Sequence, residues 1–200
     1  MQQILRGLKS HGKIEDLDLS KTGIGSDIVC MQLLGELIIS NSNMKSIGLQ
    51  GLALSEKVAA YHLIDPLSKS LHIESLNFDN NNLGNVFIQN LVDKLISNKK
   101  MDNIKEQSKN QNSDGGSRDS SIMTDSESGT NIDQTFNLGQ KERRTQGLVN
   151  LSFECNTGIG DKGAKAIATL IKTRNAFSNN LKMVNLNECG INNQGFEELK

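Results

Sequence analysis

The chain of 200 residues carries 22 basic and 23 acidic side chains, and its net charge of -1 gives no strong field to attract nucleic acid or a charged membrane. Its 36% hydrophobic and 4% aromatic residues are fewer than in an average globular chain, so part of the chain is expected to lie outside any core. No stretch approaches the roughly 18 apolar residues of a membrane span, and the first residues are too poor in apolar side chains for a signal peptide. These features predict a cytoplasmic protein, with the nucleus left open.

An apolar pattern recurs five times along the chain, in the form L-x-x-L-x-L-x-x-[N/C]-x-L with ordinary apolar exchanges. Its second apolar position falls at Leu17, Ile47, Leu76, Leu151 and Val184. The alternation with period two around this position predicts a short strand with one buried face, followed by a turn. The turn position holds Asn81, Asn156 and Cys189, which suit buried hydrogen bonding there, and Thr22 is a weaker version. Leu52 departs from the pattern and predicts an irregular turn.

Helical periodicity follows the strand segments. Apolar residues at three- and four-residue spacing predict helices over residues 28–38, 86–96 and 161–171. The turn into the last of these, Ile159-Gly160-Asp161-Lys162-Gly163-Ala164, matches the I-G-D-x-G-A sequence of the ribonuclease-inhibitor type of leucine-rich repeat almost letter for letter. The chain resembles that family over residues 1–98 and 147–200. The resemblance implies an α/β solenoid of about five repeats, a horseshoe with parallel strands on its concave face and helices on its convex face.

Residues 99–146 interrupt the pattern. Ser, Asn, Asp and Gly dominate this segment and Phe136 is its only aromatic residue, so it cannot bury enough apolar surface to offset its ordering entropy. We therefore predict a disordered low-complexity insertion between repeats 1–3 (residues 1–98) and repeats 4–5 (residues 147–200). Neither end of the chain has the polar outer face of a capping repeat, so we expect a piece of a longer array, truncated at its C-terminus.

The strand residues that alternate with the buried ones form the candidate binding site, because they line the concave face of a horseshoe. These positions include four acidic and no basic residues, which favours a protein partner with a basic surface. A merely solvated strand face is an equally weighted alternative. The candidate residues are Asp16, Asp18, Ser20, Ser46, Gln50, Ser75, Asn77, Asp79, Asn150, Ser152, Glu154, Met183, Asn185 and Asn187.

Two other functions have weaker support. Gly158, Gly160 and Gly163 match the G-x-G-x-x-G pattern of dinucleotide-binding enzymes, but Asp161 would place a carboxylate beside a pyrophosphate, so a structural turn is the favoured reading. Some repeat proteins of this type resemble GTPase activators of the Ran system. Arg6, however, precedes no matching loop, and the sequence carries no acidic tail.

The sequence therefore predicts a non-enzymatic scaffold for protein-protein interaction, without cofactor or metal. His11, His62 and His72 have no partner at the spacing of a metal site or a catalytic triad. No nucleic acid or membrane is expected as a partner, and a small molecule is disfavoured. The Asn- and Lys-bearing insertion is typical of protist proteins, which slightly favours a cytoskeletal or ciliary setting.

Overall fold

The computed structural model describes residues 1–70, 72–110, 147–173 and 180–200. Residues Met1–Met101 and Thr145–Lys200 form one compact unit, and Asp102–Arg144 form a second. The first unit contains a sheet of five parallel strands in the order β1-β2-β3-β4-β5. The strands are β1 (Asp16–Asp18), β2 (Ser46–Gly48), β3 (Ser75–Asn77), β4 (Asn150–Ser152) and β5 (Met183–Asn185).

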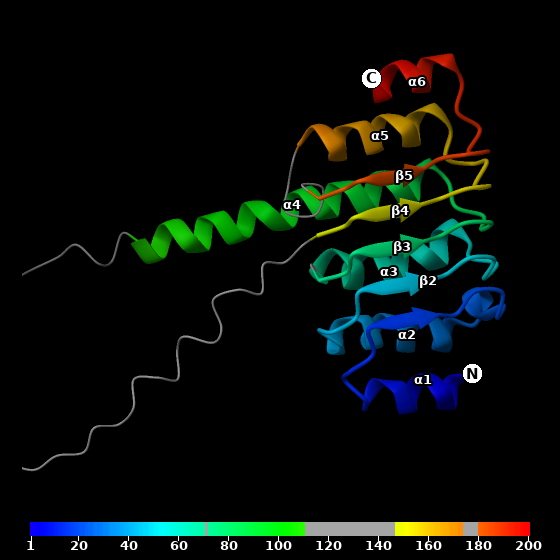
Figure 1. Cartoon of the computed structure of the whole chain (residues 1–200), viewed down its shortest axis with the longest axis vertical. Coiled ribbons are helices and arrows are strands. Elements are labelled where there is room, and N and C mark those ends of the chain that lie inside the picture. The colour runs from blue at the N-terminus through cyan, green and yellow to red at the C-terminus, as the bar shows by residue number, and fades with distance from the viewer. Residues whose placement is uncertain (71, 111–146, 174–179) are drawn as a thin grey trace, which may run out of the picture. The chain divides into compact units, whose positions relative to one another are not determined.

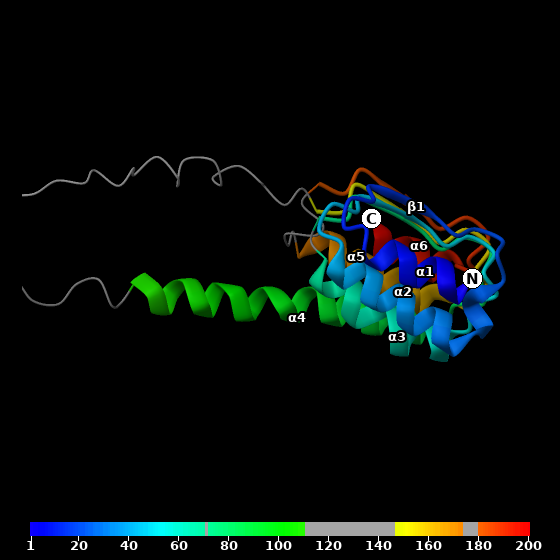
Figure 2. The ribbon, with the colours of Figure 1, turned by 90° about the horizontal axis from the view of Figure 1, so that it is seen from below.

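Helices follow or precede every strand, which makes the chain an α/β protein. A short 3-10 helix, η1 (Ile24–Ser26), lies between β1 and α2. In the first unit the strands form one layer and the helices cover one face of it, as Figures 1 and 2 show. The six α-helices of the described residues are α1 (Gln2–Lys9), α2 (Ile28–Ser40), α3 (Glu56–Lys69), α4 (Asn85–Asn110), α5 (Gly160–Lys172) and α6 (Asn193–Leu199).

The strand register aligns the apolar positions found in the sequence. Leu17 pairs with Ile47, Ile47 with Leu76, Leu76 with Leu151, and Leu151 with Val184. The pairing of β3 with β4 joins segments that are about 75 residues apart, so the sheet is continuous across the intervening residues. The physical reason is that the apolar side chains of both segments can be buried only by packing on each other.

The core lies between the sheet and the helices. Its centre is an aromatic cluster in which Phe78 stacks on Phe153 with ring centroids 5.4 Å apart, and Phe87 meets Phe78 edge-on at 5.6 Å. All three side chains are fully buried. Phe87 lies in α4, and Phe153 lies directly after β4, in the segment that follows the insertion. The cluster therefore holds α4 against the strands on both sides of the insertion.

Helix α4 differs from the sequence prediction because it runs on to Asn110, twelve residues beyond residue 98. Residues 99–110 contain lysine, glutamate, glutamine and methionine but no glycine or proline, and such residues favour a helix even where nothing packs on it. The rest of the predicted insertion, residues 111–146, lies outside the described residues.

Each strand is followed by the same backbone turn. The third residue after every strand has a positive φ, between 53° and 61°, and these residues are Lys21, Gly51, Asn80, Cys155 and Glu188. The next residue occupies the turn position of the sequence pattern. Where that position lacks asparagine, a second residue with positive φ follows it, and these residues are Gly23, Ala53 and Gly190. The turn at Leu52 therefore differs from those at Asn81 and Asn156.

Asparagine makes the difference because its amide bonds to the backbone of its own turn and to that of the preceding turn. The buried Asn156 donates to the carbonyls of Phe153 at 2.8 Å and Phe78 at 3.0 Å, and it accepts from the Leu83 N–H at 3.1 Å. Cys189 donates its thiol to the Phe153 carbonyl at 3.1 Å. Leu52 has no polar group to offer, and its own N–H donates to Asn81 Oδ1 at 3.1 Å.

Candidate functional site

The candidate site is the face of the sheet that the helices leave uncovered. Among the described residues, α1 to α6 all lie on the opposite side of the strands (Figure 2). Residues at alternate strand positions turn their side chains to this uncovered face, because successive side chains of a strand point to opposite sides. We call the fourteen predicted residues on it the polar face.

The residues of the polar face differ in how far they are exposed to solvent. Asp16, Asp18, Met183 and Asn187 are exposed, whereas Asp79 and Ser152 are buried, at 7% and 8% exposed. The remaining members are half-buried, and they are Ser20, Ser46, Gln50, Ser75, Asn77, Asn150, Glu154 and Asn185. Most of the predicted residues can therefore meet a partner. Asp79 and Ser152 differ from the other members because their polar groups are turned to each other inside the face, at 2.6 Å.

Asp79 is the centre of a hydrogen-bond network. Its Oδ1 accepts from the Ser152 hydroxyl at 2.6 Å and from the Glu154 N–H at 2.7 Å. Its own N–H donates to Asn77 Oδ1 at 2.8 Å. A buried carboxylate needs such donors, because burying a charge without them is costly. Asp79 therefore links β3 to β4 and stiffens the middle of the polar face.

The network continues to the last strand. Asn185 Nδ2 donates to Glu154 Oε2 at 2.9 Å, and Asn185 Oδ1 accepts from the Asn187 N–H at 3.1 Å. Amide and carboxylate groups from three neighbouring strands are thus held by each other. Because few of these side chains must be ordered when a partner binds, the entropic cost of recognition is reduced.

The first strand carries two exposed carboxylates, those of Asp16 and Asp18. Asp18 Oδ1 accepts from the Ser20 N–H at 2.9 Å, and hydrogen bonds from the Ser20 hydroxyl and then its backbone lower the pKa of Asp18. Asp18 therefore stays ionised at neutral pH. Asp16 lies two residues before it on the same side of β1. These two exposed carboxylates give the β1 end of the face its negative charge.

A second charged row, not predicted from the sequence, borders the polar face. It consists of the residues directly before four of the strands, namely Glu15, Lys45, Glu74 and Lys182. Lys45 Nζ contacts Glu15 Oε2 at 2.8 Å, and this hydrogen bond lowers the pKa of Glu15 and raises that of Lys45. Lys45 also attracts Asp16 and Glu74. The shared position before each strand is the signal in the sequence that would have revealed this row.

On the other border lies Cys155, in the turn after β4. Its thiol donates to Glu188 Oε2 at 3.1 Å, and this hydrogen bond, followed by desolvation and the charge of Glu188, raises the pKa of Cys155 to about 11. The thiol is therefore protonated at neutral pH and a poor nucleophile. Cys30 and Cys189 are buried, and burial raises the pKa of both thiols.

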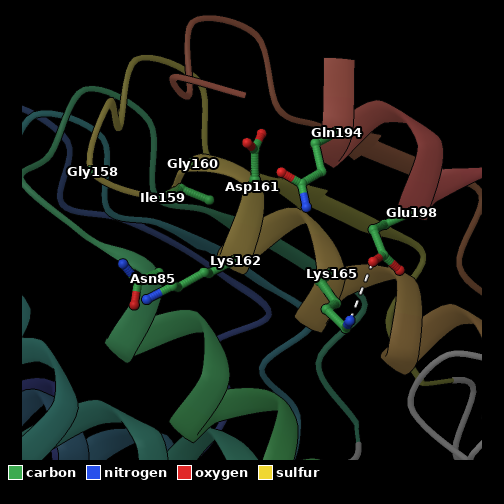
Figure 3. Close-up of a pocket in the computed structure, with 9 residues that line it drawn as sticks. All are labelled: Asn85, Gly158, Ile159, Gly160, Asp161, Lys162, Lys165, Gln194 and Glu198. Atoms are coloured by element: carbon green, nitrogen blue, oxygen red, sulfur yellow. Dashed lines mark hydrogen bonds and ion pairs between the residues drawn. The ribbon is translucent and has the colours of Figure 1, made fainter. Parts of the chain in front are cut away.

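The glycine-rich segment lies away from the polar face, at the start of α5, where a pocket of about 400 Å³ opens between α4, α5 and α6. Figure 3 shows Asn85 and Lys162 side by side in it and Lys165 paired with Glu198 at 3.2 Å. Asp161 Oδ1 accepts from the N–H groups of Asn192 at 2.7 Å and Gly195 at 3.2 Å. This carboxylate is thus committed to the start of α6.

Each glycine of this segment has a role in packing. A side chain on Gly158 would approach the Leu83 carbonyl to 3.1 Å, and one on Gly163 would meet the Ile159 side chain at 2.3 Å. Gly160 has a φ of 54°, in the left-handed region. Gly158 therefore allows the close approach of the segment before α4, Gly163 leaves room for Ile159, and Gly160 permits the turn itself. These roles favour the structural reading of this turn.

Three further features bear on the alternatives. Arg6 lies exposed on α1, in the helix layer rather than on the polar face. In the described part of the chain no three His, Cys, Asp or Glu residues are placed to hold a metal ion. No described helix is both long and apolar enough to cross a bilayer.

Comparison with known proteins identifies no relative of this chain. No protein-family model matches it, and neither characterised proteins nor solved structures show a significant similarity. The functional assignment consequently depends on the geometry described above.

Proposed function

We propose that the chain is a leucine-rich-repeat solenoid of the ribonuclease-inhibitor type and acts as a non-enzymatic scaffold. Three observations support the repeat. The apolar strand positions share one register. A residue with positive φ recurs at the third place after each strand, and the turn residues Asn81, Asn156 and Cys189 donate to equivalent carbonyls of the preceding segment. In such a solenoid the polar face is the concave surface.

The proposed ligand is a protein that presents a basic surface to the polar face. The observation that carries this proposal is the pair of exposed carboxylates on β1, Asp16 and Asp18. On the same face, beyond β2, lies the hydrogen-bond network centred on Asp79. Exposed carboxylates can pair with lysine or arginine, and the ordered amides can accept and donate further hydrogen bonds. Lys45, which pairs with Glu15, places a positive charge at the border of the acidic surface. This charge would repel the basic groups of a partner and so orient the partner along the strands.

Charge reversal tests this function. The double variant Asp16→Lys/Asp18→Lys should lose capture of the partner from a cell extract by at least about tenfold, because like charges then face its basic surface. Asp79 is left unchanged because its replacement would break the buried network. The matched control, Asp93→Lys/Glu197→Lys, makes the same change of charge on helices α4 and α6. Equal capture by both double variants, with both folded by circular dichroism, would contradict the proposal.

The other functions remain alternatives of lower rank. A GTPase activator of the Ran type has only the family resemblance and the exposed Arg6 in its favour. A dinucleotide-binding enzyme would have to place a pyrophosphate beside Asp161, whose carboxylate already caps α6. Titration with a nicotinamide or flavin nucleotide, followed by fluorescence, should accordingly show no saturable binding.

A further inference from the structure

Gly48, the last residue of β2, leaves one position on the uncovered face of the sheet without a side chain. It is paired with Asp18 of β1 on one side and with Asn77 of β3 on the other. The residues in register with it in the last two strands are Ser152 and Asn185. The other four strands therefore present a polar side chain at this level of the face, and β2 presents only its backbone.

The carboxylate of Asp18 uses the space that this glycine leaves. A Cβ atom added to Gly48 would lie 2.5 Å from Asp18 Oδ1, 3.1 Å from Asp18 Cγ and 3.3 Å from Ser20 Oγ. The first distance is far shorter than a non-bonded contact, which is about 3.5–4.0 Å between carbon atoms. Asp18 therefore reaches across from β1 and lies over the backbone of β2, where only a glycine leaves room for it.

Ser20 fixes the carboxylate in this place. Its N–H donates to Asp18 Oδ1 at 2.9 Å, and its hydroxyl also bonds to the carboxylate. The Ser20 Oγ in turn accepts from the N–H of Gln50, in the turn after β2, at 3.3 Å. The carboxylate is thus anchored to its own strand and, through Ser20, to β2.

We propose that Gly48 is a positioning residue, which leaves the Asp18 carboxylate the space over β2 and so holds it ready for a cationic side chain of the partner. This inference rests on the proposed function, in which Asp18 pairs with a basic surface. Asp18 stays exposed in this position. Because its side chain is already ordered by the bonds to Ser20, pairing with a lysine or arginine costs less side-chain entropy than it would for a mobile carboxylate.

Gly48→Ala tests the positioning without a partner. Only the ends of two flexible side chains would have to move, so the variant should fold. The methyl group should push the carboxylate away from Ser20, and the pKa of Asp18, which these hydrogen bonds lower, should rise towards its ordinary value. Titration of the Asp18 carboxyl carbon by NMR measures this pKa. An unchanged pKa would overturn the proposal.

Ser46→Thr is the matched control. It adds one methyl group to the same face of the same strand, opposite Asp16 rather than Asp18, because Ser46 is paired with Asp16. The pKa of Asp18 should stay as it is in the unsubstituted chain. An equal rise in both variants would reveal a general disturbance of β2 and would also overturn the proposal.

A double-mutant cycle tests the role in recognition. The probe is a fluorescently labelled peptide of about ten lysines, whose binding is followed by anisotropy at low salt, where charge pairing is least screened. Gly48→Ala should weaken binding about threefold and should change nothing in an Asp18→Asn background, because Gly48 acts only through that carboxylate. An equal loss in both backgrounds contradicts the proposal. If Asp16→Lys/Asp18→Lys loses the peptide and Gly48→Ala does not, this inference alone fails. If neither variant loses it, the proposed function fails as well.

Discussion

Neighbouring residues of one turn have contrasting roles. Asn156 is buried, and its amide joins the backbone of its own turn to that of the preceding one. Cys155, directly before it, has a φ of 59° and bonds to Glu188 instead. The side chain of Asn156 therefore serves the fold, while that of Cys155 lies at the border of the polar face.

The pKa of Cys155 gives a test at this scale. Because that pKa is raised to about 11, the thiolate forms only as the pH rises towards 11, and alkylation by iodoacetamide at pH 8 should be slow. Glu188→Gln removes the main cause and should accelerate alkylation about tenfold, since a larger thiolate fraction outweighs the lower nucleophilicity of the more acidic thiol. Mass spectrometry of the modified peptide measures the rate.

Glu154→Gln is the matched control, because the charge of Glu154 contributes less to the pKa of Cys155 than Glu188 does. It should change the rate less. Equal rates in the Glu188→Gln variant and the unsubstituted chain would show that Glu188 does not hold the thiol.

At the scale of elements, α4 and α6 each receive a carboxylate from the helix before them. Glu56 in the first turn of α3 accepts from the Phe87 N–H in α4 at 2.9 Å, and Asp161 in the first turn of α5 accepts from the Gly195 N–H in α6 at 3.2 Å. The equivalent residue of α4 is Asn85, for which no such bond to α5 is formed among the described residues. The start of α5 therefore lacks the carboxylate that the other two helices receive.

This difference predicts a stabilising substitution. Asn85→Asp supplies a carboxylate near the N-terminal end of α5 and beside Lys162, and it should stabilise the fold by roughly 0.5–1 kcal/mol. The gain should be present at neutral pH and lost in acid, because only the ionised carboxylate carries the charge that interacts with the start of the helix. Urea denaturation at pH 7 and pH 3 measures it.

The reverse change in the next helix is the control. Asp161→Asn removes the negative charge at the start of α6 and should destabilise the fold at pH 7. If Asn85→Asp destabilises the fold as well, the inferred equivalence of the two positions is incorrect.

At the scale of the whole molecule, the core of the described residues passes without interruption from β3 to β4. Every buried hydrophobic residue of the cluster that holds the sheet to the helices lies before residue 96 or after residue 147. The stacked Phe78 and Phe153 join the two parts directly. The stability of the first unit should therefore be largely independent of the intervening residues.

Deletion of residues 102–144 tests this independence. With a flexible linker of about ten glycine and serine residues in their place, the chain should keep its helix and sheet content and melt within a few degrees of the full chain, because a shorter loop costs less closure entropy. The matched control deletes the same residues from a Phe153→Ala variant, which should melt far lower because a buried aromatic side chain is lost. Unfolding of the deletion variant alone would show that the second unit supports the first.

The sequence by itself determined the five strands, three of the six described α-helices and the residues of the polar face, because an apolar repeat every two residues in a strand, or every 3.6 in a helix, reports directly which side chains are buried. Helix α3 was not predicted. The recurring pattern also marked Leu17, Ile47 and Leu76 as equivalent positions, and the structure pairs them in one register. The tertiary structure alone decided which polar side chains are available. Asp79 and Asp18 look alike in the sequence, but only Asp79 has a neighbouring strand that supplies a hydroxyl and an amide to its carboxylate. Such partners lie about 75 residues away in the chain, at a distance where local pattern carries no information.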